Sequence, residues 1–324
     1  MSPSRFAAAL ALSLAAAALS PTAHAQDYPT KPIHMVVPFA AGGAVDAVAR
    51  IVGQALSERL KQPVIVENKP GASSNIGMEA VAKAAPDGYT LLMASNGIAT
   101  NNALFPTLAF DGRKDFVPVA RVGYAPLVFV VPASSPDRTL AALIADAKAN
   151  PGKLTYGSAG NGTSGHLTGE LFKSAAGIDV LHVPYKGGAP AITDLLGERI
   201  TFMPINPLEV LPNIKAGKLR ALAVASDQRV PYLPDVPTAT EAGLPGFDAT
   251  VWWGVVAPAK TPPAIVARLN EEIDKVLRDP AVAKRLEDAG VVIVPQTPEQ
   301  FGRFIAAQTD LWTRVVKSAG IRPD

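Results

Sequence analysis

The chain has 324 residues, with 30 basic and 28 acidic side chains and no cysteine. Its charge is nearly balanced and no basic tract stands out, which argues against a nucleic-acid-binding protein. Without cysteine the chain can form no disulfide, so its stability must come from a packed core.

Residues 1–25 have the pattern of a secretory signal. Arg5 precedes an apolar run over Phe6–Leu19, and an Ala-His-Ala sequence ending at Ala25 matches the small residues at which such signals are cleaved. The run is shorter than the roughly 20 residues that a membrane-spanning helix needs. We therefore predict cleavage after Ala25 and export of a soluble chain that begins at residue 26.

After the signal, apolar runs typical of strands alternate with amphipathic helical segments. The segment 33–39 is rich in β-branched residues, and in 45–60 the apolar residues recur at the three- and four-residue spacing of a helix face. This alternation predicts an α/β fold with mostly parallel sheets and helices on both faces. Further strands are predicted at 63–68, 89–95, 126–132, 154–160, 180–185, 200–206 and 219–226, and further helices at 78–85, 139–150, in the later part of 161–177, and at 186–197 and 207–217.

Two segments about 125 residues apart share one pattern. In 127–152 and in 252–280, a strand and a proline are followed by a short Ser/Thr/Pro stretch and a helix. The recurrence favours two crossings of the chain between two lobes, although strand–proline–helix order is also common in α/β proteins without such crossings. The predicted lobe 1 covers 26–126 and 253–324, the predicted lobe 2 covers 127–252, and the hinge strands are expected near 126–132 and 251–258.

Four of the predicted strands end in turns that contain glycine. These turns are Ala40–Gly43, Asn96-Gly97, Asn161–Gly165 and Lys186–Gly188. Helix N-termini offer unpaired N–H groups, and glycine lets the backbone approach a ligand closely. Any single turn has a structural explanation, because strand-to-helix turns favour glycine anyway. Together, at the carboxyl ends of strands, they predict an anion-binding cleft.

Asp46 follows the first of these turns and lies in the first turn of the predicted helix. An acid at this position stabilises the helix dipole by about 0.3–1 kcal/mol. It could equally accept a hydrogen bond from a ligand N–H group or from ordered water beneath a ligand. The sequence leaves both interpretations open.

Motifs for catalysis are incomplete. The stretch from Gly162 to His166 is close to a nucleophile elbow, but His166 stands where that motif needs its second glycine. Ser164 and His166 are only two residues apart, so on a helix they diverge. The mature histidines are scattered without the spacing of a zinc site, and no phosphate-binding loop is present. The residues therefore favour binding over catalysis, and we expect no cofactor and no metal.

Six stretches together resemble the receptors of tripartite tricarboxylate transporters, known as Bug-type solute-binding receptors. The stretches are 28–50, 62–92, 154–173, 181–197, 217–226 and 233–247, and the resemblance extends over essentially the whole mature chain. It implies a two-lobed periplasmic binding protein of the Venus-flytrap, type II-like kind, with two crossing strands. It also implies a small organic carboxylate as ligand, delivery to membrane transporter subunits, location in the periplasm and a monomeric chain.

The same resemblance implies which residues contact the ligand. The first wall would consist of Phe39, Ala41, Gly42, Gly43 and Asp46, with Ser95, Asn96 and Gly97. The opposite wall would consist of Ser158, Asn161, Gly162, Thr163, Ser164, Lys186 and Gly187, and Asn206 completes the set.

Two positions depart from the family pattern. Ala41 replaces a proline in the first loop, and Ile205 replaces an acid near the end of the strand at 200–206. The loss of that acid favours a purely anionic or partly apolar ligand over one with an amino group. Two alternative functions stay open: a sensing receptor without a transporter, and an esterase that uses Ser164 and His166.

Overall fold

The computed structural model describes residues 28–105 and 107–319, so the predicted signal and its cleavage site lie outside the described residues. The chain separates into two compact units, Met1–Thr30 and Lys31–Asp324, and every helix and strand named below belongs to the second unit. None of the described helices combines the length and the apolar character needed to cross a membrane.

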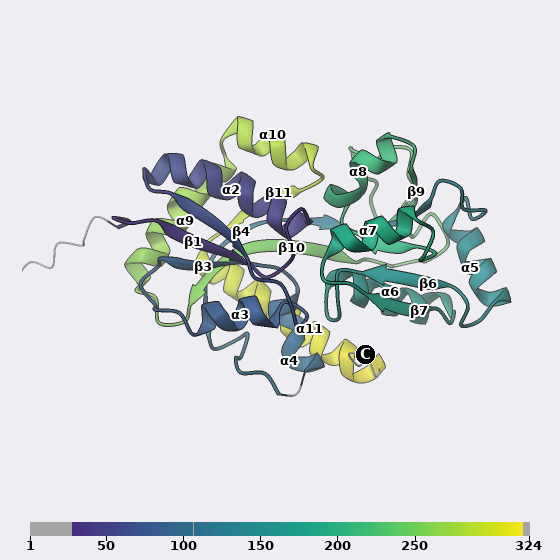
Figure 1. Cartoon of the computed structure of the whole chain (residues 1–324), viewed down its shortest axis with the longest axis horizontal. Coiled ribbons are helices and arrows are strands. Elements are labelled where there is room, and N and C mark those ends of the chain that lie inside the picture. The colour runs from purple at the N-terminus through teal and green to yellow at the C-terminus, as the bar shows by residue number, and fades with distance from the viewer. Residues whose placement is uncertain (1–27, 106, 320–324) are drawn as a thin grey trace, which may run out of the picture. The chain divides into compact units, whose positions relative to one another are not determined.

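The larger sheet has six strands in the order β11-β4-β10-β3-β1-β2 (Figure 1). β1 runs parallel to both β2 and β3, whereas β10 runs antiparallel to its neighbours β3 and β4, and β11 runs antiparallel to β4. The strands are β1 (Ile33–Val37), β2 (Val64–Asn68), β3 (Thr90–Ala94), β4 (Phe116–Pro126), β10 (Thr250–Pro258) and β11 (Val292–Gln296).

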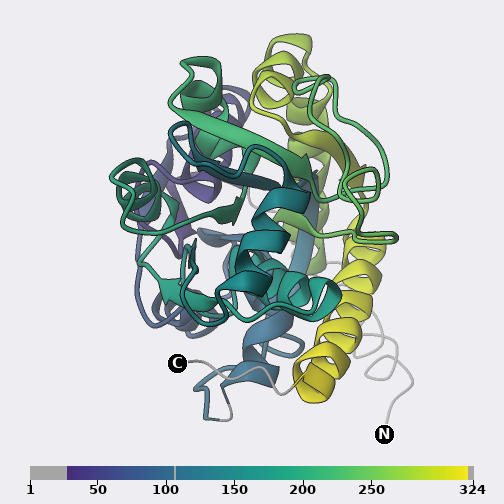
Figure 2. The same cartoon turned by 90° about the vertical axis from the view of Figure 1, so that its right-hand side faces the viewer.

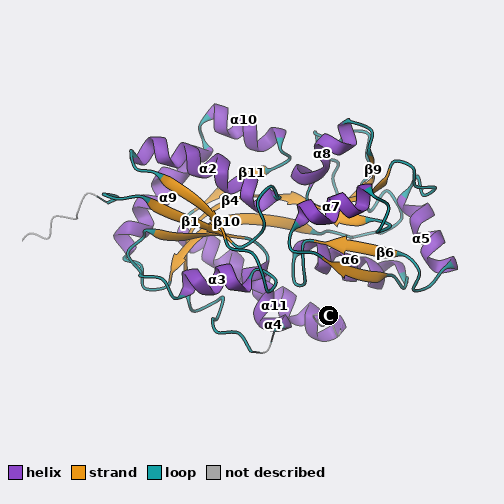
Figure 3. Ribbon diagram, in the orientation of Figure 1, coloured by secondary structure: helices purple, strands orange, loops and turns teal. Residues whose placement is uncertain are grey.

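Helices pack on both sides of this sheet, and α2 and α3 lie on opposite sides of its strands in Figure 3. One core cluster joins Val36 of β1, Leu92 of β3 and Trp252 of β10 to Phe301. Buried β-branched and aromatic side chains thus fix the strands whose ends reach the candidate site. The helices are α2 (Ala44–Leu60), α3 (Asn75–Ala82), α4 (Gly97–Leu104), α9 (Pro263–Leu277), α10 (Pro280–Asp288) and α11 (Pro298–Ala319).

The remaining strands form a three-stranded sheet, β8-β5-β9, and a two-stranded sheet, β6-β7. A bridge between Tyr156 and Phe202 connects β6 to the chain just before β8, so these strands adjoin one another. Figure 2 views the molecule from this side, with the teal and green segments in front. The elements are β5 (Val128–Pro132), α5 (Leu140–Ala149), β6 (Thr155–Ser158), α6 (Ser164–Ala176), β7 (Leu181–Pro184), α7 (Gly188–Leu196), β8 (Met203–Ile205), α8 (Pro207–Lys215) and β9 (Leu219–Val224).

The predicted α/β class is confirmed, but the sheets are mixed rather than mostly parallel. β1–β2, β1–β3 and β6–β7 are parallel pairs, while β3–β10, β4–β10, β4–β11, β5–β8 and β5–β9 are antiparallel. β4, which the sequence did not predict as a strand, adds two of these antiparallel pairs, while the other three join strands that the sequence does predict. The helix predicted at 78–85 is α3 at Asn75–Ala82, and α4 at Gly97–Leu104 is a helix that the sequence did not predict.

The chain passes between the two groups of strands at two neighbouring places. Only Leu127 separates β4 from β5, and Ala249 directly precedes β10. The Leu127 N–H donates to the Ala249 carbonyl at 3.0 Å, and the Ala225 N–H donates to the Leu127 carbonyl at 2.7 Å. The two connections therefore lie side by side, close to the positions at which the sequence predicts hinge strands.

Candidate ligand-binding site

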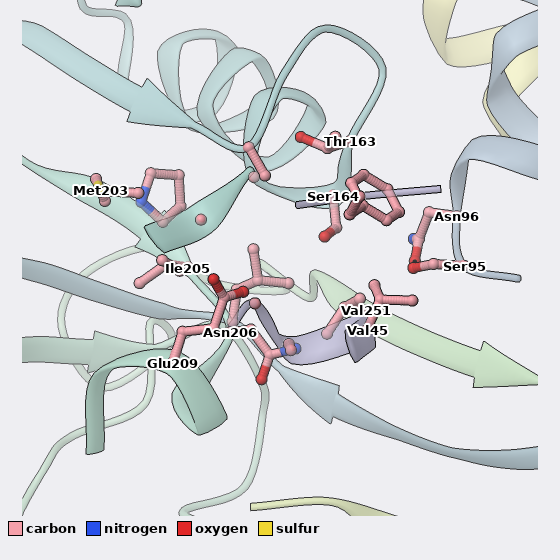
Figure 4. Close-up of a pocket in the computed structure, with 18 of the residues that line it drawn as sticks. Val45, Ser95, Asn96, Thr163, Ser164, Met203, Ile205, Asn206, Glu209 and Val251 are labelled. Atoms are coloured by element: carbon pink, nitrogen blue, oxygen red, sulfur yellow. The ribbon is translucent and has the colours of Figure 1, made fainter. Parts of the chain in front are cut away.

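A cavity lies where the ends of β1, β3 and β6 meet the first turns of α2, α4, α6 and α8 (Figure 4). The volume of this cavity is about 50 Å³. In Figure 4 the side chains of Ser164 and Glu209 approach this space from opposite sides. Eight of the predicted ligand-binding residues line it: Phe39, Gly43, Ser95, Asn96, Gly97, Thr163, Ser164 and Asn206.

Lys186 and Asn161 line a neighbouring cavity of about 200 Å³ instead, together with Phe39 and the loop Gly71–Ser74. That loop holds three consecutive non-glycine residues, Ala72 to Ser74, at positive φ. Such left-handed backbone costs roughly 1–3 kcal/mol per residue and persists only where the surroundings impose it. Six other predicted residues line neither cavity: Ala41, Gly42, Asp46, Ser158, Gly162 and Gly187.

The first turn leads from β1 into α2 and places backbone N–H groups at the cavity. Gly42 adopts φ +85°, a conformation that side chains disfavour, and Gly43 is the N-cap of α2 in an extended conformation. No side chain of the N-cap residue closes this helix end. Ala44 and Val45, the first two residues of α2, both line the cavity.

Asp46 is buried and holds this turn from behind. Its carboxylate accepts hydrogen bonds from the Gly42 N–H at 3.0 Å, from Arg50 Nε at 2.9 Å and from Asn68 Nδ2 at 2.9 Å. Burial alone would raise the pKa of Asp46, but the hydrogen bonds from Arg50, Gly42 and Asn68 outweigh it and hold the pKa below its usual value. This geometry matches the helix-capping interpretation, and a direct role of Asp46 in ligand binding stays a prediction.

Asn96 connects the cavity wall to the strand that follows the second chain connection. Its Nδ2 donates to the Thr250 carbonyl at 3.1 Å, and its Oδ1 accepts from the Trp252 N–H at 3.2 Å. Asn96 also lines the cavity as the N-cap residue of α4, without capping that helix through its side chain. A ligand that contacts this residue would therefore touch a side chain bonded directly to β10.

The opposite turn is supported by a pair of stacked histidines. The Gly162 N–H donates to His166 Nδ1 at 3.0 Å, and Ser158 Oγ lies 2.7 Å from His182 Nε2. The two rings stack with their centroids 4.2 Å apart. Burial, and secondly the charges of His182 and Lys173, lower the pKa of His166 to about 3, so this ring is neutral near pH 7. Ser158 and Gly162 thus shape the turn from behind the cavity wall.

Glu209 also lines the cavity and is not among the predicted ligand-binding residues. It lies in the first turn of α8, and its carboxylate accepts a hydrogen bond from the Ala44 N–H of α2. Its Oε2 is buried and has no hydrogen-bond partner among the described residues. Burial raises the pKa of Glu209 to about 7, against the opposing effect of the Ala44 N–H.

A sequence signal for Glu209 did exist. Like Asp46, it is an acid in the first turn of a helix that follows a strand. Asn206 is the N-cap of α8 and accepts a hydrogen bond from the Leu208 N–H at 3.0 Å, so Glu209 is not needed to cap its own helix. Its carboxylate instead reaches the first turn of α2.

The fold is that of periplasmic solute-binding proteins. The structure of Rpa4515 of R. palustris with adipate is 36% identical, with a TM-score of 0.89, and covers 92% of this chain and 100% of that one. The structure of MatC (Rpa3494) from Rhodopseudomonas palustris with bound malate is 34% identical, with a TM-score of 0.85, and covers 89% of this chain and 100% of that one.

Sequence comparison places the chain within one family of such proteins. The model of the tripartite tricarboxylate transporter family receptor matches residues 48–321, and the chain belongs to this family. The protein BugT of Bordetella pertussis is 39% identical over 324 residues, which cover 99% of each chain. The predicted family is therefore confirmed, and the chain is a solute-binding receptor of the periplasmic kind.

Proposed function

We propose that this receptor captures a small organic carboxylate in the cavity and delivers it to the membrane subunits of a tripartite transporter. One observation carries the proposal. α2, α4 and α6 each direct their first residues at the cavity, and no N-cap side chain is bonded to the first turn of any of them, although the Ala44 N–H of α2 donates to Glu209. Helix ends of this kind bind anions through unpaired N–H groups and the positive end of the helix dipole.

Some of the other helices do have a side-chain cap. Thr139 caps α5 by accepting from the Ala142 N–H, and Asp279 caps α10 by accepting from the N–H groups of Ala281 and Val282. α3, α7 and α9 likewise have no N-cap side chain bonded to their first turn, whereas Asn206 caps α8, whose first turn lines the cavity. The support for an anion site therefore comes from the convergence of the first residues of α2, α4 and α6 on one cavity, and the two related structures hold the acids adipate and malate.

The two adjoining connections support a receptor that closes by hinge motion. In this proposal, lobe 1 comprises 26–126 and 253–324 and lobe 2 comprises 127–252, with the bend at Leu127 and Ala249. Residues of both proposed lobes line the cavity, so closure would enclose the ligand. The proposal includes a monomeric chain, exported to the periplasm after cleavage behind Ala25.

A thermal-shift screen of small mono-, di- and tricarboxylic acids tests this function. We expect at least one acid to raise the melting temperature, with a stabilisation of about 2.7 kcal/mol when its concentration is 100 times its dissociation constant. Isothermal titration should then give one site per chain. If no carboxylic acid shifts the melting temperature or gives binding heat, the proposed function is wrong.

We further infer that the chain does not hydrolyse esters, because the neutral His166 uses Nδ1 to hold Gly162 and is a very weak base. The wild type and a Ser164→Ala variant should both release product from a chromogenic acetate ester only at the rate of buffer alone. Release by the wild type that is lost in the variant would instead assign Ser164 as a nucleophile.

A further inference from the structure

Among the side chains that line the cavity, the only ionisable group is Glu209, and no lysine, arginine or histidine of the described chain joins it there. A ligand with carboxylates alone would bring its negative charge beside the buried Oε2 of Glu209. Neighbouring carboxylates in such a site cannot both stay ionised at low cost. The side chains of the cavity therefore favour an anion that also brings a positive charge, because an anion without one would require Glu209 to bind a proton.

The position of the carboxylate shows where that charge would bind. One oxygen of Glu209 accepts from the Ala44 N–H, which fixes the carboxylate across the cavity from its own helix. Oε2 lies so close to the backbone of Gly188 that a Cβ on that residue would be 1.5 Å away. This packing holds Oε2 in place, buried and without a hydrogen-bond partner among the described residues.

An ammonium group on the ligand would supply the N–H donors that Oε2 lacks. An ammonium offers N–H donors and no acceptor, so it complements a carboxylate oxygen that has acceptor sites to fill. The Ser164 hydroxyl, which faces the cavity from the side opposite Glu209, is a further acceptor. Gly97 and Ser164, the first residues of α4 and α6, bring N–H groups to the same cavity for a ligand carboxylate.

We propose that the ligand of this receptor carries a protonated amine as well as a carboxylate, and that Glu209 is the residue that selects for the amine. The inference rests on the proposed function. It reverses the expectation of a ligand without an amino group. That expectation came from Ile205, which stands at the end of β8 where the family pattern has an acid. Glu209 brings an acid to the same cavity from the first turn of the following helix.

Matched pairs of acids that differ only in an amino group test the inference. The pairs are alanine and propionate, aspartate and succinate, glutamate and glutarate, and 4-aminobutyrate and butyrate, titrated at pH 8 so that Glu209 is ionised and the amines are protonated. We expect the amino member of at least one pair to bind at least tenfold more tightly than its partner, a difference of roughly 1.4 kcal/mol.

The Glu209→Gln variant keeps the shape of the side chain and removes its charge. We expect it to lose the preference, with the amino member bound at least tenfold more weakly than by the wild type. Glu299→Gln is the matched control, because Glu299 is also a first-turn acid, in α11, and does not line the cavity. This control should bind like the wild type.

Two results would overturn the inference while leaving the proposed function intact. In one, plain acids bind as tightly as their amino partners. In the other, Glu209→Gln keeps the wild-type preference, which would assign amine recognition to other groups. Failure of every acid, with or without an amine, would instead refute the proposed function itself.

Discussion

Replacing Gly43 with valine is expected to weaken ligand binding by roughly 100-fold while leaving the fold intact, on the basis of the 1–3 kcal/mol cost of overfilling a packed space. Gly43 lines the cavity as the N-cap of α2. A Cβ on this residue would lie 3.7 Å from both the Ala40 carbonyl and Glu209 Oε2, so a single methyl fits. The two further methyl groups of valine would extend into the space beside Glu209 and the first turn of α2.

Gly43→Ala is the matched control, because its Cβ makes only ordinary contacts and the φ of −84° suits any residue. We expect near-wild-type affinity for the alanine variant, and for both variants a ligand-free stability within about 1 kcal/mol of wild type, the usual range for N-cap changes. Isothermal titration and urea unfolding measure the two quantities separately. Unchanged affinity in Gly43→Val would mean that the ligand binds away from this turn.

The strand–turn–helix of residues 33–60 could be predicted because its signals are local. β-branched residues form β1, the glycine pair makes the turn, and Val48, Val52 and Leu56 recur on one face of α2 and are fully buried. The same kind of local signal identified the other glycine turns. Eight of the sixteen ligand-binding residues that the family resemblance implies line one cavity, including residues far apart in the sequence.

β4 was missed because its pattern is not that of a strand. Pro118, Arg121 and Gly123 interrupt it, yet the strand lies between β10 and β11 and is mostly buried. The Arg121 guanidinium stacks over the Phe304 ring at 3.7 Å, and burial lowers the pKa of this arginine to about 10. Partners on distant segments stabilise this strand, and a propensity read along the sequence cannot include them.

Glu209 was missed for a related reason. As a first-turn acid its pattern is ordinary, and acids are favourable at that position in any helix. Its significance comes from Ala44 and Gly188, which the fold brings against its carboxylate from α2 and α7. Tertiary structure also decides the role of Asp46, for which the sequence leaves both capping and ligand contact open. Its carboxylate accepts three hydrogen bonds from Gly42, Arg50 and Asn68.

Asp46→Asn should therefore act mainly on stability. The wild-type carboxylate is buried and accepts from Gly42, Arg50 and Asn68, and hydrogen bonds to a charged group contribute about 1.5–3 kcal/mol. Because Arg50 is about half exposed, solvent screens part of its contribution. We expect the free energy of unfolding at pH 7 to fall by about 2 kcal/mol, with a smaller effect on ligand affinity.

The stabilisation by Asp46 should decrease as the pH is lowered. The pKa of Asp46 is lower in the folded chain than in the unfolded one, so its stabilisation is fully present above the unfolded value of about 4. It is lost as the pH falls through the lower, folded value. Urea unfolding should consequently show a gap between wild type and Asp46→Asn that is constant from pH 8 to pH 5 and narrows below about pH 4.

Asp288→Asn provides the matched control for this measurement. Asp288 is also a helical acid four residues from a basic partner, Lys284, but both side chains are exposed. Exposed pairs of this kind contribute about 0.3–0.5 kcal/mol, so this variant should unfold almost like the wild type at every pH. If Asp46→Asn kept full stability but bound ligand much more weakly, the carboxylate would belong to the ligand site itself. The loss of stability expected here would make it the support of the glycine turn instead.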